Sequence, residues 1–129
     1  MPFTTLYVAK EYDVIAPDGS EIRLLPELNG GSMAHITLRP NQVSYPVTHK
    51  TVEEIWYVLS GEGEMWRKNG NQESITRLKP GCSLTIPLGT HFQFRNLLSQ
   101  PLEMVLITMP PWPGADEAVS VPGYWPTDE

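Results

Sequence analysis

Residues 41–61 of this chain have the sequence NQVSYPVTHKTVEEIWYVLSG, whose second half is rich in branched and aromatic residues. A run of this composition that ends at a glycine indicates a β-strand followed by a turn. Side chains of a strand point alternately to its two faces, so Glu54, Trp56 and Val58 share one face. We predict that this face lines the interior of a β-barrel. The opposite face then carries three large apolar side chains that need cover by a second subunit or by the C-terminal tail, namely Ile55, Tyr57 and Leu59.

Residues 81–96, with the sequence GCSLTIPLGTHFQFRN, form the second informative segment. The same alternation places Phe92, Phe94 and Asn96 on one inner face. Between closely spaced turn signals lie further short segments of strand-forming residues, which is typical of an antiparallel sandwich or barrel. We expect an all-β domain over residues 1–109. Its strands are predicted near residues 4–9, 21–25, 32–39, 43–49, 53–59, 62–68, 73–78, 83–87, 91–96 and 102–109.

The last segment, residues 110–129, combines prolines with the aromatic residues Trp112, Tyr124 and Trp125. Proline fixes an extended backbone, and aromatic side chains provide apolar area for docking. We expect a tail that packs on its own barrel or on a partner subunit. A ligand for a proline-recognising module is the alternative.

Composition narrows the functional classes. The chain has 129 residues, a mass of 14.5 kDa, a net charge of −6 and an isoelectric point near 5.0. This acidic balance opposes binding to nucleic acid or to anionic lipid. A single cysteine, Cys82, excludes an internal disulfide, and no apolar run is long enough to span a bilayer. We expect a cytoplasmic protein of one domain that binds neither nucleic acid nor membrane.

The spacing within the two segments resembles the two-part signature of the cupin superfamily. The first part is matched by Asn41, Val47-Thr48-His49, Glu54 and Gly61, and the second by Gly81, Pro87-Leu88-Gly89, Phe92 and Asn96. The resemblance implies a double-stranded β-helix, also called a jelly roll, whose barrel holds one small ligand and which often forms homodimers. Cupins include isomerases, dioxygenases, epimerases and binding proteins, so the fold alone does not determine a function.

In the cupin signature three histidines and a glutamate bind a metal, but here Val47 and Phe92 stand at two of the histidine positions. His49 and Glu54 alone make a weak metal site, because zinc and iron usually take three or more protein ligands. We therefore expect no cofactor. The alternative is a divalent transition metal with His35 as third ligand, in an isomerase or a dioxygenase-like enzyme. Apolar alternation slightly favours Ala34, Ile36 and Leu38 as the inner face, which would point His35 outward.

We predict that His49 and Glu54 are the polar groups of a largely apolar cavity that takes a small organic molecule. An imidazole beside a carboxylate in such a pocket can also act as a general acid or base. In the competing interpretation the core is filled and the pair forms an internal hydrogen bond. The candidate ligand-binding residues are Val47, Trp56, Val58, Phe92, Phe94, Asn96, Met104 and Leu106.

Overall fold

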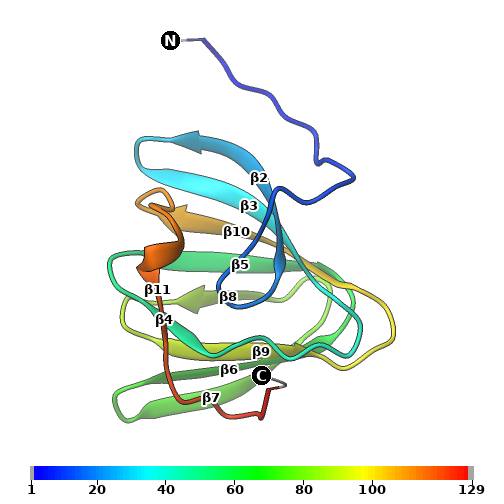
Figure 1. Cartoon of the computed structure of the whole chain (residues 1–129), viewed down its shortest axis with the longest axis vertical. Helices are drawn as coiled ribbons and strands as arrows, with labels where there is room; N and C mark the ends of the chain where they lie inside the picture. Colours follow the sequence, from blue (N-terminus) through cyan, green and yellow to red (C-terminus); the bar gives the residue numbers. More distant parts are fainter. Residues whose placement is uncertain (1, 128–129) are drawn as a thin grey trace.

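The computed structural model describes residues 2–127 and contains two antiparallel sheets that face each other as a flattened barrel (Figure 1). The strand order is β1-β2-β3-β10-β5-β8 in the six-stranded sheet and β11-β4-β9-β6-β7 in the five-stranded sheet. This is the all-β jelly roll that the two segments predict. The elements are β1 (Val14–Ile15), β2 (Glu21–Leu28), β3 (Gly31–Leu38), β4 (Val47–His49), β5 (Glu53–Ser60), β6 (Gly63–Asn69), β7 (Gln72–Leu78), β8 (Ser83–Ile86), β9 (His91–Asn96), β10 (Leu102–Met109), the 3-10 turn η1 (Ala115–Glu117) and β11 (Ala118–Ser120).

Period-two alternation places the core as predicted. Along β5 the residues Glu54, Trp56 and Val58 are buried while their neighbours are exposed. Trp56 meets Phe94 and Phe92 edge to face, with ring centroids 5.1 and 5.8 Å apart. Such T-shaped pairs are the favoured geometry of aromatic rings. These three rings join the two sheets at the centre of the barrel.

The predicted strand near residues 4–9 is wrong. In the structure the chain before β1 runs as an extended arm away from the barrel (Figure 1). Its residues have strand-like composition, but the neighbouring edge of β2 already pairs with β1. The arm is held where Arg23 donates hydrogen bonds to the backbone oxygens of Ala9 and Lys10. The predicted strand 43–49 also shortens to three residues, preceded by a single bridge between Val43 and Arg95.

The tail, as far as residue 127, packs on its own barrel. β11 pairs with β4, and the side chain of Gln93 donates to the backbone oxygen of Trp125 and accepts from the backbone N–H groups of Tyr124 and Trp125. Alternation along β9 points Gln93 outward, yet it is fully buried because the tail covers it. Residues 128 and 129 of the predicted tail lie outside the described residues. Within the described chain, no helix is both long and apolar enough to cross a bilayer.

Candidate functional site

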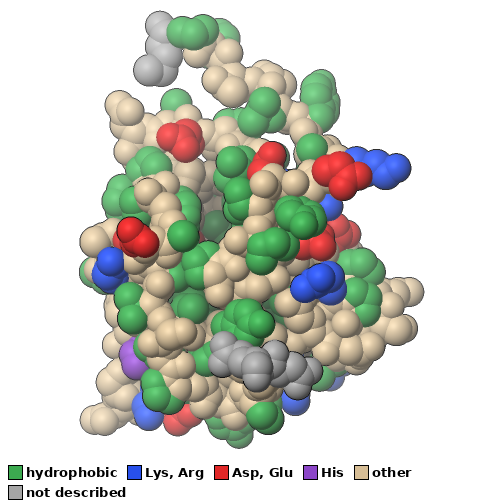
Figure 2. All heavy atoms as spheres, in the orientation of Figure 1, with side chains coloured by type: hydrophobic (Ala, Val, Ile, Leu, Met, Phe, Trp, Pro, Cys, Tyr) green, Lys and Arg blue, Asp and Glu red, His purple; other side chains and the backbone are tan. Residues whose placement is uncertain are grey.

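A cavity of about 460 Å³ opens between the barrel, the loop that follows β1 and the tail. Figure 2 shows the molecule hollowed there, with hydrophobic side chains around the opening. Apolar walls come mainly from β1, β2 and β3, with one residue each from β4, β5, β9 and β10, and the tail closes one side with Trp112. The buried polar side chains in the lining are those of Asp18, Ser20, His49, Glu54 and Thr108. The site therefore combines an apolar enclosure of small-molecule size with a few convergent polar groups.

Glu54 is buried at the inner end of this cavity. The indole nitrogen Nε1 of Trp56 donates to its Oε1 at 3.0 Å, and the hydroxyl of Thr108 donates to its Oε2 at 2.6 Å. Burial disfavours the charged carboxylate and raises the pKa of Glu54 to about 7, although both hydrogen bonds oppose this shift. At neutral pH the carboxyl group is thus close to half-protonated.

His49 reaches the same place from β4 and is 7% exposed. Its Nδ1 lies 3.9 Å from Oε1 of Glu54, too far for a hydrogen bond, and has no other partner among the described residues. The ring packs edge to face between Phe92 and Trp112, at centroid distances of 5.2 and 5.3 Å. Burial lowers the pKa of His49 to about 4, a shift that the charge of Glu117 opposes. The imidazole is therefore neutral at physiological pH.

Comparison with known proteins gives the family. Residues 34–108 match the family model described as Cupin domain. The chain is a member of the cupin family. It is 31% identical over 125 residues to an uncharacterised protein of Methanocaldococcus jannaschii, an alignment that covers 90% of this chain and 97% of the relative.

Solved structures share the fold at low identity. The Streptomyces protein PAC13, solved with uridine, superposes with a TM-score of 0.69 at 15% identity and covers 92% of both chains. The cupin domain of Drosophila melanogaster CENP-C gives a TM-score of 0.63 at 17% identity over 70% of both chains. These likenesses show the jelly roll of the cupin and not a shared activity.

Of the eight residues predicted to bind the ligand of this cupin, four line the cavity: Val47, Trp56, Phe92 and Leu106. The other four, Val58, Phe94, Asn96 and Met104, lie in the closed core and do not line it. The alternation of side chains along a strand identifies the inward-facing residues correctly. It does not indicate which of them line the cavity and which lie in the closed core. The amide of Asn96 is occupied elsewhere, since its Nδ2 donates to the backbone oxygens of Leu38, Arg39 and Gln100. Asn96 thus joins loops and does not line the cavity.

Four residues at or beside the site are not among the predicted site residues: Asp18, Thr108, Trp112 and Glu117. Asp18 precedes Gly19 and is easily taken for an ordinary turn residue, yet its side chain lines the cavity. Thr108 could have been found, because the alternation of β10 places it on the inner face. Trp112 and Glu117 belong to the tail, whose docking site no local pattern indicates.

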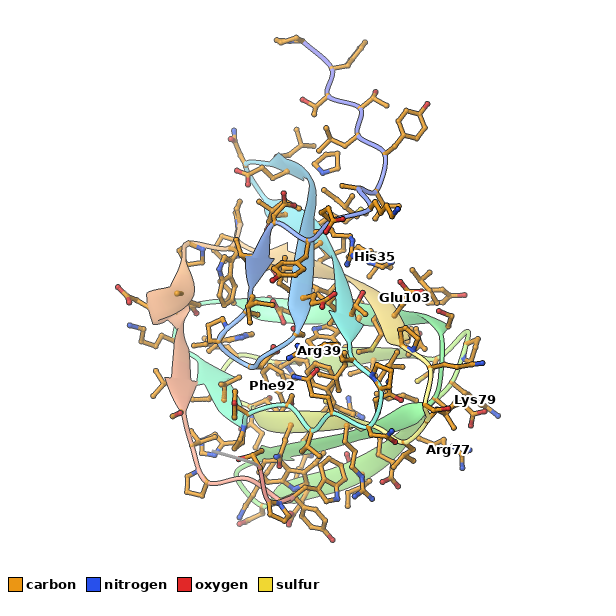
Figure 3. The ribbon with its side chains drawn as sticks, turned by 45° about the vertical axis from the view of Figure 1, so that its right-hand side comes forward. His35, Arg39, Arg77, Lys79, Phe92 and Glu103 are labelled. Atoms are coloured by element: carbon orange, nitrogen blue, oxygen red, sulfur yellow. The ribbon has the colours of Figure 1, made fainter. Side chains whose placement is uncertain are left out.

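The donor set does not fit the metal site of a typical cupin. Val47 and Phe92 offer no lone pair, and His35 cannot replace them. His35 lies on the outer face of β3, with Nε2 at 3.8 Å from Oε1 of Glu103 (Figure 3). The structure therefore does not bring His35 together with His49 and Glu54, the three residues of the alternative metal set. Among the residues that the structure describes, no group of three or more metal-binding side chains comes together.

Proposed function

We propose that this cupin binds a small organic molecule in the barrel cavity and transfers protons to and from it without a metal. The observation that carries the proposal is the pair of His49 and Glu54, which lie 3.9 Å apart at the end of the cavity without bonding to each other. A pair of this kind in a filled core would normally be satisfied internally. Here the Nδ1 of His49 is buried and unpartnered among the described residues, as expected for a group that bonds to a ligand.

The protonation states support an acid/base role. His49 is neutral above about pH 4, so it can accept a proton, and Glu54 is neutral below about pH 7, so it can donate one. For a ketone, the α C–H bond would break and its proton would pass to Nδ1 of His49. The electron pair would form the enol double bond, while the carboxyl proton of Glu54 passes to the carbonyl oxygen. Reversal restores both residues, so the cycle balances without a further reactant.

The test is deuterium exchange into the methyl group of acetophenone in D₂O, followed by proton NMR. We expect exchange above the buffer rate, with a pH profile that rises through about pH 4 and falls through about pH 7. His49→Ala should lower the rate roughly 10²-fold or more, because general bases typically contribute at least this much. Glu53→Gln is the matched control, since Glu53 is the exposed neighbour of Glu54 on the opposite face.

Each alternative outcome is distinct. Exchange that is unchanged in His49→Ala would contradict the acid/base role. Loss of exchange on adding EDTA, with its return on adding a divalent metal, would contradict metal independence. If acetophenone and related neutral ketones do not bind at all by isothermal titration calorimetry, the cavity is not a ligand site for this class.

We also infer that the cupin forms a homodimer through the outer face of its six-stranded sheet. On that face Ile55 and Tyr57 are 48% and 46% exposed, and they stand beside Ile107 and Val105 of β10. The tail docks on the other sheet and leaves this apolar surface uncovered. A contiguous apolar surface of this kind marks an interface more often than free surface.

Ile55→Glu is expected to convert the dimer to a monomer, because it places a charge at the centre of the proposed contact. The measurement is mass by light scattering after size-exclusion chromatography. Ile75→Glu is the matched control, since Ile75 is an isoleucine of similar exposure, 43%, on β7 of the opposite sheet. A wild-type monomer, or a dimer that survives Ile55→Glu, would contradict the proposed interface.

A further inference from the structure

The ionisable side chains that line the cavity are acidic, apart from one histidine. Three carboxyl groups line it, those of Asp18, Glu27 and Glu54, whereas no lysine or arginine does so. The only basic side chain in the lining is His49, and its imidazole is neutral at physiological pH. A ligand that enters this cavity therefore meets carboxyl groups without a cationic partner. Burial raises the pKa of Asp18 and of Glu54, and a cation on the ligand would favour their charged forms.

Asp18 is the most informative of the three. It lies in the loop between β1 and β2 and is 9% exposed. Its Oδ1 accepts hydrogen bonds from the backbone N–H and the hydroxyl of Ser20, at 2.9 and 2.6 Å. None of the ion pairs among the described residues involves Asp18. Buried carboxylates are normally paired with a cation, so the position lacks the partner that would offset its burial.

Two further features point to a ligand and not to an acidic surface cluster. The first is the buried and unpartnered Nδ1 of His49, which belongs to the same cavity. The second is the aromatic lining, because Trp56, Phe92 and Trp112 present ring surface to the space that Asp18 borders. Aromatic rings combined with a carboxylate are the usual environment in which proteins bind organic ammonium groups.

We infer that the ligand is a small organic amine, with its ammonium group at Asp18 and its apolar body against Trp56 and Phe92, and that carboxylates and phosphates are excluded. This inference rests on the proposed binding function and adds the charge class of the ligand. An ammonium group would donate a charge-assisted hydrogen bond to the carboxylate of Asp18, which offsets the desolvation of both groups. A carboxylate would have to lose its hydration beside three acids with no donor of opposite charge.

Three probes of similar size test the inference: the cation 2-phenylethylamine, the neutral alcohol 2-phenylethanol and the anion phenylacetate. Dissociation constants are measured by isothermal titration calorimetry at pH 7. We expect the amine to bind roughly tenfold or more tightly than the alcohol, as for one added hydrogen bond between charged groups, and phenylacetate to bind most weakly. Asp18→Asn should remove the amine preference, with a loss of roughly tenfold for the amine and less than about twofold for the alcohol.

Asparagine keeps an oxygen that accepts from Ser20, so the loop should fold in the Asp18→Asn variant, and unchanged binding of the alcohol verifies this directly. Asp116→Asn is the matched control, because Asp116 is an exposed acid of the tail outside the cavity lining. Equal binding of amine and alcohol, or tightest binding of phenylacetate, would overturn the inference and leave the proposed binding function intact. An amine preference that persists in Asp18→Asn would overturn the role of Asp18. Failure of all three probes to bind would overturn both proposals.

Discussion

Replacing Glu54 with glutamine is expected to stabilise the protein by about 3 kcal/mol at pH 8.5 and by less than about 1 kcal/mol at pH 4.5. The folded-state pKa of Glu54 is about 7, above its ordinary value of 4.5. The folded state therefore binds more protons than the unfolded state between these two values. The favourable contribution of the protonated carboxyl is complete below pH 4.5 and is lost as the pH rises through about 7. Glutamine cannot ionise, so the Glu54→Gln variant avoids the cost of burying a charged carboxylate at high pH.

The geometry allows the substitution. The glutamine oxygen can accept from Trp56 Nε1, and its amide group can donate to the hydroxyl of Thr108, which replaces the two hydrogen bonds of the carboxyl group. The measurement is the free energy of unfolding in urea at both pH values, with Glu53→Gln as the exposed control. An equal gain in the free energy of unfolding at both pH values, or a loss at pH 8.5, would show that burial does not raise the pKa of Glu54 to about 7.

His49 acts in the opposite direction. Its folded-state pKa of about 4 lies below the ordinary value of 6.5, so its contribution is complete above pH 6.5 and is lost as the pH falls through about 4. Between these limits the two groups nearly cancel in the pH dependence of stability. Burying the ionisable groups of Glu54 and His49 lowers the stability of the protein, and a neutral residue at position 54 would remove part of this loss. Stability losses of this kind are common at functional sites, where the pKa values of side chains are shifted.

Replacing Glu117 with glutamine is expected to destabilise the protein by about 3 kcal/mol at pH 7. The carboxylate of Glu117 is buried and accepts from the backbone N–H and the hydroxyl of Thr51 and from the backbone N–H of Val52. Burial opposes the charge of Glu117, but these hydrogen bonds outweigh it and hold its pKa below the usual value. Glutamine has one oxygen for these donors, and its own amide hydrogens would face them.

Because the pKa of Glu117 is lowered by folding, its contribution is present above pH 4.5 and is lost as the pH falls through the folded-state value. The measurements are the urea midpoint and the intrinsic tryptophan fluorescence, to which Trp112 contributes from its position against His49. Asp116→Asn is the adjacent, exposed control and should change stability by less than about 0.5 kcal/mol. A loss of the same small size in Glu117→Gln would mean that the tail is attached by β11 and Gln93 alone.

Part of this structure follows from local sequence. Fixed spacing and period-two alternation place Glu54, Trp56 and Phe92 on inner faces, because consecutive side chains of a strand must point to opposite sides. The same rule places His35 outside once the face of β3 is known. The replacement of two histidine positions by Val47 and Phe92 is visible in the sequence itself.

The cavity required the tertiary structure. Asp18 lies 36 residues before Glu54 and Trp112 lies 58 residues after it, and nothing in their local sequence says that they meet at one opening. Gln93 and Asn96 occur in the same strand, yet one binds the tail and the other joins loops, because their partners come from distant segments. The sequence alone determined the jelly roll, the inner faces of β5 and β9, and the presence of Val47 and Phe92 at two histidine positions of the cupin signature. Only the folded chain decided which polar groups are buried without a partner, because hydrogen bonding and desolvation depend on neighbours in space and not along the chain.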